Sequence, residues 1–327
     1  MENRCCINYN RKHKQDGKGQ AKSVYTRKVF LTMAYNVISK PKQNFSLHTH
    51  TIGFDGQNTP AAMVAGAQYM CIEHLGISNH FIVHPNITRA KFYPFALERG
   101  YSAIYSSGFD EAIAKFKQHY AELNQKKLQD FANDCDVKIY RGMEVDFFDY
   151  PEWQSGFERA LNMLQPDYVI CASHFVEYDS MLCNVHDFAN VDDQARDDML
   201  KLYWEKLGRA AETGLFNFMA HLDLPKKTGV GTEEKWAEYE QMAIDKIAKS
   251  KTPIEINTSF YNRNRDEPYP SARILKMAAA ANIPVIISDD AHRAEHIGRY
   301  FDRADGFARA CGINNFLTCD MVLRKTR

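Results

Sequence analysis

The sequence of 327 residues predicts an α/β fold, a barrel of seven mostly parallel strands that forms one domain. Seven short apolar, β-rich runs alternate with longer helical segments from residue 44 onward, which is the pattern of a mostly parallel sheet. Neither an internal repeat nor a low-complexity linker divides this region, and barrels of this length are commonly single domains. Seven such units fit a barrel better than an open sheet with a ligand cleft.

The predicted strands are short runs of β-branched, aromatic and other apolar residues, the types that favour strands. In chain order they are Phe45–Leu47, Leu75–Ser78, Val137–Arg141, Tyr168–Ala172, Phe216–Ala220, Ile254–Asn257 and Val285–Ser288.

The predicted helices lie between these strands. The first has Thr59 as its N-cap, and the second is long, with apolar residues at helical spacing. In order they are Pro60–Met70, Asp110–Asn133, Glu152–Leu164, Val191–Glu212, Glu233–Ala248, Ser271–Ala280 and His292–Cys311. The segment Phe81–Phe109 is rich in Pro, Gly and Tyr and lacks a clear period, so we expect a long loop near the functional site.

Charge is balanced over the whole chain, with 41 basic and 41 acidic residues, but it is uneven. Residues 1–43 contain ten Lys or Arg and only two acids. We expect this basic arm to be disordered and the domain to run over residues 44–327. A role in organelle targeting or anion binding, and a start of translation at Met33, remain alternatives. The arm also keeps a nucleic-acid partner open, through attraction to phosphates.

The eight cysteines contain no C-x-x-C pair, so a cysteine-based zinc site is not expected. The basic arm has no apolar run long enough for a signal peptide or a membrane span. We therefore expect reduced thiols and a cytoplasmic protein without a membrane partner. The sequence leaves the oligomeric state open.

Potential metal ligands follow six of the seven predicted strands. The first strand leads into His48 and His50, which lie two residues apart and can face one metal. Others come at the ends of later strands: His80, Glu144, His174, His221, Asp290 and His292. In a barrel of parallel strands these ends gather at one mouth. Imidazole and carboxylate without thiolate suit Zn²⁺, Mn²⁺ or Fe²⁺.

The order of these motifs resembles the PHP (polymerase and histidinol phosphatase) family over roughly residues 44–300. The motifs are HTH with a following DG, SNH, GME, SH, HLD and DDAH. The resemblance implies a distorted seven-stranded barrel with three divalent metal ions. It also implies the ligands of each ion. These would be His48, His50, Glu144 and Asp290 for the first, Glu144, His174 and His221 for the second, and Asp55, His80 and His292 for the third.

Such a site predicts hydrolysis of a phosphoester. A bridging carboxylate, Glu144, would hold two cations about 3.5–4 Å apart, and a hydroxide between them would attack phosphorus. We take Glu144, Asp290 and His292 as the catalytic residues. Asp223 and His292 lie near ligands in the sequence and are both candidates for the proton donor.

The sixth predicted strand has no metal ligand and leads into substrate-binding candidates. It reads E-I-N-T-S, followed by Arg263 and a Tyr-Pro pair, which resembles the histidinol-phosphate phosphatase branch of the family. Asn257, Arg263 and Arg293 are the candidates, because guanidinium groups bind oxyanions in a bidentate manner. In that branch an acid often stands where this chain has Asn79, and Gly where it has Cys171.

We therefore predict a phosphatase that converts L-histidinol phosphate to L-histidinol and phosphate, a step of histidine biosynthesis. A small phosphorylated molecule is the expected partner. One alternative is a nuclease or phosphodiesterase of the same family, acting on nucleotides or nucleic-acid ends. Another is a metal-binding scaffold without catalytic activity. The histidines that match no motif are expected to be ordinary surface or core residues: His74, His84, His119, His186 and His296.

Overall fold

The computed structural model describes residues 43–324. Its main sheet confirms the predicted seven-stranded barrel: all seven strands are present and run parallel in sequence order. They are β1 (Phe45–Ser46), β2 (His74–Ile77), β5 (Lys138–Asp146), β6 (Tyr168–Ala172), β9 (Phe218–Met219), β10 (Ile254–Asn257) and β11 (Val285–Ser288). The predicted basic arm lies outside the described residues except for Gln43, so the domain boundary near residue 44 stays a prediction.

The barrel is nearly closed between its first and last strands. Just beyond β1 and β11, Thr49 and Ala291 form a parallel bridge. The His50 amide donates to the Ala291 carbonyl at 2.9 Å, and the Ala291 amide donates to the His48 carbonyl at 3.2 Å. This closure brings the segment around residues 48–50 beside the segment around residues 290–292.

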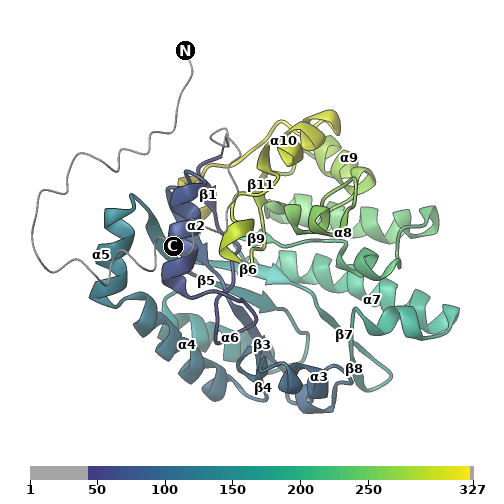
Figure 1. Ribbon diagram of the computed structural model, residues 1–327. Helices are drawn as coiled ribbons and strands as arrows, with labels where there is room; N and C mark the ends of the chain where they lie inside the picture. Colours follow the sequence, from purple (N-terminus) through teal and green to yellow (C-terminus); the bar gives the residue numbers. More distant parts are fainter. Residues whose placement is uncertain (1–42, 325–327) are drawn as a thin grey trace, which may run out of the picture.

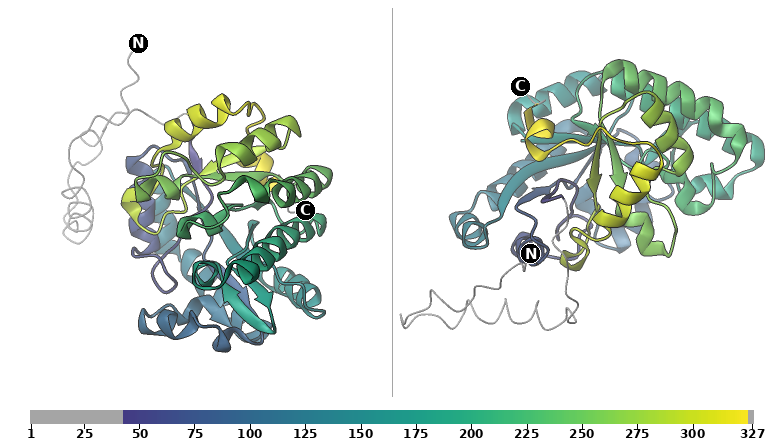
Figure 2. Two further views of the ribbon diagram at one scale, coloured as in Figure 1. Left: turned by 90° about the vertical axis from the view of Figure 1, so that its right-hand side faces the viewer. Right: turned by 90° about the horizontal axis from the view of Figure 1, so that it is seen from above.

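Helices lie on the outside of the strands, as Figures 1 and 2 show. They are α2 (Pro60–Tyr69), α4 (Phe109–Leu123), α5 (Lys126–Asp134), α6 (Trp153–Leu164), α7 (Asp193–Glu212), α8 (Ala237–Ser250), α9 (Ala272–Ala280), α10 (Phe301–Ala310) and the short α11 (Cys319–Leu323). The Thr59 hydroxyl accepts from the Ala62 amide at 3.3 Å, which is the predicted N-cap of α2.

Two predicted helices differ from the structure. The predicted helix Asp110–Asn133 is two helices, α4 and α5, because Asn124 ends the first and Gln125 is not helical, with ψ 129°. Asparagine competes with helical hydrogen bonds and favours such ends. The predicted helix His292–Cys311 becomes α-helical only at Phe301, because Gly298 and Tyr300 adopt left-handed backbone conformations with φ 69° and 65°.

The segment Phe81–Phe109 is not a structureless loop, so that prediction was wrong. It contains most of β3 (His80–Val83), then η1 (Ile87–Arg89), α3 (Tyr93–Glu98), η2 (Ser102–Ile104) and β4 (Tyr105–Ser106). β3 pairs with the second half of β5, His80 opposite Glu144. His80 therefore begins β3 and does not end β2. The apolar run Phe81–Val83 is too short to stand out by periodicity, and it becomes a strand because β5 extends far enough to pair with it.

An antiparallel hairpin after β6 was also missed by the sequence analysis. Its strands are β7 (Phe175–Tyr178) and β8 (Met181–Asn184). The turn residues Asp179 and Ser180 both have positive φ, 49° and 61°, as in a type I′ turn. Ser180 is not one of the residues that usually signal such a turn in a sequence.

The inside of the barrel is apolar at one end and polar at the other. The apolar end contains a cluster that includes Tyr168, Ile170 and Phe218, and α11 covers it through Cys319 and Val322. The Tyr168 ring occupies the space that side chains at Gly76 and Gly142 would need. The carboxyl ends of the strands lie at the polar end, which leaves that end for the functional side chains.

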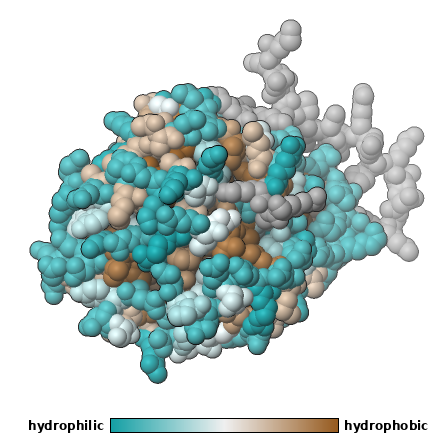
Figure 3. All heavy atoms as spheres, turned by 180° about the vertical axis from the view of Figure 1, so that it is seen from behind, coloured by the Kyte–Doolittle hydropathy of each residue, from teal (hydrophilic) through white to brown (hydrophobic). Residues whose placement is uncertain are grey.

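The cysteines agree only partly with the expectation of reduced thiols. Five cysteines are free, four of them buried, but Cys71 is disulfide-bonded, which contradicts the expected reduced state there. Over residues 43–324, we find no helix with the length and apolar character needed to cross a membrane. Figure 3 shows one face of the molecule as mostly hydrophilic, with smaller hydrophobic patches between polar groups.

Candidate metal centre

Glu144 lies at the centre of the polar end of the barrel. β5 carries it there, and the residue is 1% exposed. Ring nitrogens of five histidines lie near its carboxylate oxygens, at 2.7 Å for His80, 2.9 Å for His221, 3.3 Å for His48, 3.5 Å for His50 and 3.7 Å for His174. One carboxylate is thus surrounded by the ends of several strands, as a group that bridges metal ions would be.

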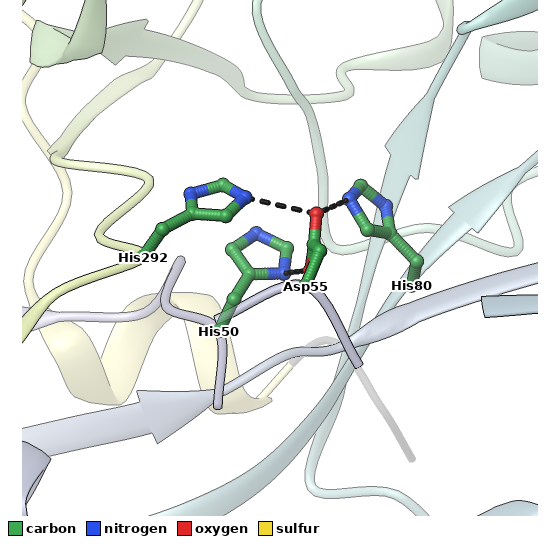
Figure 4. A group of neighbouring side chains, drawn as sticks. All are labelled: His50, Asp55, His80 and His292. Atoms are coloured by element: carbon green, nitrogen blue, oxygen red, sulfur yellow. Dashed lines mark hydrogen bonds and ion pairs between the residues drawn. The ribbon is translucent and has the colours of Figure 1, made fainter. Parts of the chain in front are cut away.

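Asp55 is a second centre, in the loop between β1 and α2. Its Oδ2 lies 3.0 Å from Nε2 of both His80 and His292, and its Oδ1 lies 3.4 Å from Nδ1 of His50 (Figure 4). A side chain at Gly56 would collide with the backbone of His50. The glycine of the DG motif therefore lets this loop fold back onto His50 and brings Asp55 to the histidines.

Asp290 completes the cluster from the end of β11. Its Oδ1 lies 3.0 Å from His50 Nε2 and 3.5 Å from His48 Nε2. The residue has a left-handed backbone, with φ 49°. This conformation is uncommon for residues other than glycine, and it is tolerated where the surroundings fix it, often at functional sites.

The structure brings all nine predicted ligands into one cluster, but the nearest neighbours do not follow the three predicted groups strictly. His50 lies with Asp55, His80 and His292 as well as with His48 and Glu144. His221 lies with His48 and Asp290, and His80 lies with Glu144 and His174. The division of the ligands among three ions therefore stays a prediction.

The donor atoms of the cluster suit divalent metal ions. Seven buried nitrogen and oxygen atoms in it lack a well-aligned hydrogen bond, although all but the last lie within 3.5 Å of an oppositely charged group: His48 Nε2, both ring nitrogens of His50, Asp55 Oδ1, His80 Nδ1, Glu144 Oε2 and His221 Nδ1. Burial of such atoms without a partner is costly, and native structures satisfy nearly all of them. Coordination of divalent cations would satisfy these atoms, and imidazole with carboxylate is a donor set that Zn²⁺, Mn²⁺ and Fe²⁺ accept.

Without a metal, the carboxylates of the cluster stabilise the protonated forms of its histidines. Burial opposes the charge on His48, but the carboxylates of Glu255, Glu144 and Asp290 outweigh it and raise the His48 pKa well above its usual value. The pKa of His80 is also raised well above its usual value, against its burial, by Glu144 and Asp55. The pKa of His292 rises to about 9 against burial, chiefly through Asp55.

The pKa values of the carboxyl groups shift in the opposite direction. Burial alone would raise the pKa of Glu144, but the surrounding histidines, His80 first, lower it well below its usual value. The pKa of Asp55 is lowered in the same way, chiefly by His80 and His292. Metal ions must therefore displace protons from the imidazoles when they bind.

Glu255, on β10, orients two of the predicted ligands. It is fully buried, and its carboxylate lies 2.6 Å from His48 Nδ1 and accepts from the His221 amide at 2.9 Å. Ser288 donates a further short hydrogen bond to it. Glu255 belongs to the E-I-N-T-S segment, but its role could not be predicted there because its contacts with His48 and His221 depend on the folded barrel. A carboxylate behind a metal-binding histidine fixes the ring orientation and tautomer.

We predict that Glu255→Gln weakens metal binding by about ten- to a hundredfold while the barrel still folds. The amide keeps the shape of the side chain, but it presents a donor where a carboxylate oxygen accepts from its neighbours, either His48 and Ser288 or His221 and Asn257. Metal affinity is measured by titration against a chelating dye, with the unfolding temperature followed in parallel. Unchanged affinity would show that Glu255 does not position His48 or His221.

Asp146 is a second functional residue that the sequence analysis missed. It accepts from the His174 amide and lies near His174 Nδ1, both at 2.7 Å, and it is 1% exposed. The predicted strand around residues 137–141 was too short, whereas β5 extends to Asp146. Residues two apart on a strand share a face, so the E-V-D sequence after Gly142 could have placed Asp146 beside Glu144.

Asn79, which stands where the histidinol-phosphate phosphatase branch often has an acid, has a structural role. Its Oδ1 accepts from the Thr51 amide and its Nδ2 donates to the Thr51 hydroxyl, both at 2.9 Å. His119, on α4, lies 3.0 Å from Asn79 Nδ2. Asn79 therefore ties the loop that carries His50 and Asp55 to the barrel.

The three substrate-binding candidates lie in different surroundings. Asn257 is buried, and its amide group donates to Glu255 at 2.9 Å and accepts from the Ser259 amide at 2.9 Å. Arg263 is exposed, at the end of η6 (Thr258–Arg263), with neither a hydrogen bond nor an ion pair to the described residues. Arg293 lies 3.5 Å from Glu295, with 46% of its side chain exposed. Their roles in binding stay predictions.

The barrel and the cluster at its polar end define a metal-dependent hydrolase. The chain belongs to the PHP domain family, which matches residues 45–259 and confirms the resemblance seen in the motifs. As a member of the histidinol-phosphate phosphatase branch of this family, the chain is a metal-dependent phosphatase.

Three similar proteins have related names. A probable histidinol-phosphatase of Deinococcus radiodurans is 27% identical over 232 residues, which cover 67% of this chain and 85% of that protein. A putative histidinol phosphatase of Listeria monocytogenes has a similar structure, with a TM-score of 0.55 and 18% identity over 79% of this chain and 98% of that one. The histidinol phosphate phosphatase of Lactococcus lactis, solved with zinc, L-histidinol and phosphate, has a TM-score of 0.55 and 17% identity, covering 84% and 96%. At these identities the two solved structures support the fold.

Proposed function

We propose that the chain hydrolyses L-histidinol phosphate to L-histidinol and phosphate with three bound divalent ions, Zn²⁺, Mn²⁺ or Fe²⁺. The observation that carries this proposal is the convergence of five imidazoles on the buried carboxylate of Glu144. The name of the Deinococcus relative supports the choice of substrate. The Lactococcus structure, which holds zinc, L-histidinol and phosphate, agrees with it.

In this proposal Glu144 and the other eight predicted ligands would hold the ions. Bound divalent ions supply a Lewis acid for phosphoryl oxygens and a water that loses its proton near neutral pH. The chain holds the ligands in place before substrate arrives: Glu255 orients His48, Asp146 orients His174, and Asn79 anchors the loop of His50. Such a preorganised site stabilises the transition state without rearranging during the reaction.

Of the two candidates for the proton donor we take Asp223, two residues after the predicted ligand His221, as the group that protonates the leaving alkoxide. Burial raises its pKa, although Lys226 at 3.0 Å opposes this. Its Oδ2 accepts from the Ser271 amide at 2.8 Å, while its buried Oδ1 has no hydrogen-bond partner. A carboxyl group whose pKa is raised keeps its proton to a higher pH than an exposed one does, which favours a role as proton donor.

We predict that Asp223→Asn lowers kcat by about a hundredfold or more for an alkyl phosphate monoester such as histidinol phosphate. The reason is that an alkoxide leaves only if it is protonated. The loss should be much smaller for p-nitrophenyl phosphate, whose leaving group is stable as an anion. Equal losses for the two substrates would remove Asp223 from the proton transfer.

Substrate identity is tested by phosphate release from three compounds at equal concentration with the Mn²⁺-loaded protein. These are histidinol phosphate, a nucleoside monophosphate and a phosphodiester. The proposal expects a kcat/KM for histidinol phosphate at least about a hundredfold above the others, a preference that needs about 2.7 kcal/mol of differential transition-state binding. Preference for the diester or nucleotide would support the nuclease alternative. Metal binding without turnover of any of the three would support a non-catalytic scaffold.

A further inference from the structure

Lys206 is a lysine on the buried face of α7. Only 8% of its side chain is exposed, and Tyr203, Leu207 and Ala210 are buried on the same helix face. Lysine is almost never fully buried unless its charge is paired, because removal of an ammonium group from water costs free energy. The partners of Lys206 therefore indicate the role of its charge.

These partners lie directly behind His174, one of the predicted metal ligands. The Lys206 Nζ donates to the carbonyl of Phe175, the residue after His174, at 2.7 Å, and lies 4.0 Å from Oδ1 of Asp146. It also lies 4.4 Å from the centre of the Phe148 ring, as in a cation–π contact. Lys206 is thus tied both to the end of β5 and to the backbone that follows His174.

Asp146 connects Lys206 to His174 and, through His174, to Glu144. One carboxylate oxygen of Asp146 accepts from the His174 amide, and the other lies near His174 Nδ1, both at 2.7 Å. The second ring nitrogen of His174, Nε2, lies 3.7 Å from Oε1 of Glu144. Burial opposes the charge of Asp146, but His174 and, after it, Lys206 lower its pKa. A continuous line of contacts therefore runs from α7 to the centre of the cluster.

We propose that Lys206 is a positioning residue of the metal centre, which fixes Asp146 and the backbone after His174 and so directs His174 Nε2 towards Glu144. This inference rests on the proposed function, in which His174 is a metal ligand. A carboxylate held at Nδ1 fixes the tautomer and the ring orientation that leave Nε2 free to bind a metal. A lysine that served packing alone could be replaced by methionine, another long unbranched side chain, without a change in metal affinity.

The test is a titration of the full-length chain, first freed of metal with a chelator, against Zn²⁺ in competition with a chelating dye. We expect Lys206→Met to weaken binding of one ion, the one at His174, by about tenfold, the lower end of the effect of removing a partner behind a metal ligand. The remaining ions should bind as in the wild type. Phosphate release by the variant should need more Mn²⁺ to reach half of its maximal rate, whereas KM for the substrate at saturating Mn²⁺ should not change.

Two further variants serve as rescue and control. Lys206→Arg should recover most of the lost affinity, because it keeps a positive charge beside Asp146. A cavity of about 240 Å³, whose lining includes Lys206, Phe148 and Leu202, leaves room for the larger guanidinium group. The matched control is Lys201→Met, also on α7, at a lysine with 51% of its side chain exposed. It should change neither the metal affinity nor KM.

Unchanged Zn²⁺ affinity in Lys206→Met, with folding confirmed by the unfolding temperature of the metal-free chain, would overturn the proposal. So would an equal loss at every bound ion, because that pattern indicates a general disturbance of the barrel. If the methionine variant does not fold, Lys206→Gln replaces it, since it keeps a donor and removes the charge, and it should lose affinity in the same way. Failure of the proposed function looks different: the wild type would bind metal without hydrolysing histidinol phosphate, and Lys206→Met would still weaken the binding of Zn²⁺.

Discussion

Glu144→Gln is expected to lower phosphate release by about a thousandfold or more, together with the amount of bound metal. Stabilisation by metal ions contributes several kcal/mol to such reactions, and each 1.36 kcal/mol corresponds to about tenfold in rate. No other carboxylate in the cluster has so many imidazoles around it, and Glu144 is almost fully buried. The neutral amide would offer one acceptor oxygen in place of a charged bridge between two cations.

Glu177→Gln is the matched control for this substitution. Glu177 lies 2.8 Å from the ring of His84, outside the cluster, and 47% of its side chain is exposed. The control should keep wild-type activity and metal content, because it removes a carboxylate from a histidine outside the groups of potential ligands. If Glu144→Gln retained more than about a tenth of the wild-type rate, Glu144 could not be the residue that bridges the ions.

Removal of the metal is the second change with a large expected effect. A ligand present at about a thousand times its dissociation constant stabilises the folded state by about 4 kcal/mol. For a chain of this size, that is a fall in unfolding temperature of roughly 6 °C when a chelator removes the metal. Phosphate release should stop when the metal is removed and return when Mn²⁺ or Zn²⁺ is added back.

The stability of the metal-free protein should also fall as the pH rises. His48, His80 and His292 have raised pKa values in the folded state, so each contributes stability that is complete below the unfolded value near 6.5. That contribution is lost as the pH rises through the folded pKa, which is about 9 for His292. The lowered pKa values of Asp55 and Glu144 act oppositely, and their contribution is lost only in acid.

Bound metal replaces these protons, so the metal-loaded protein should not share the alkaline loss. The difference between the unfolding temperatures of the two forms should therefore widen from pH 6.5 to pH 9. Differential scanning fluorimetry with and without chelator measures it across this range. Two curves that stay parallel would mean that the imidazoles do not exchange protons for metal.

The sequence predicted the barrel and the clustering of the candidate ligands, because both depend on local patterns. β6, β10 and β11 have the predicted bounds, since each is a short apolar run between polar turns. His221 and Asp290 follow such runs, so their place at the strand ends could be read from the chain. Their convergence required only that the strands be parallel.

The residues that sequence analysis missed owe their roles to contacts between distant segments. Asp146 acts on His174, which is 28 residues away, and Glu255 acts on His48, which is 207 residues away. The position of His80 depends on the pairing of β3 with β5. The apolar run Phe81–Val83 is too short to predict this pairing from the sequence.

Anomalous scattering from crystals grown with Mn²⁺ tests the central claim most directly, because it locates the ions among their ligands. We expect three peaks at the carboxyl ends of the strands, two of them on either side of the Glu144 carboxylate and the third beside Asp55. Peaks away from these carboxylates, or no peak within the cluster, would contradict the assignment of a trinuclear metal centre to this chain.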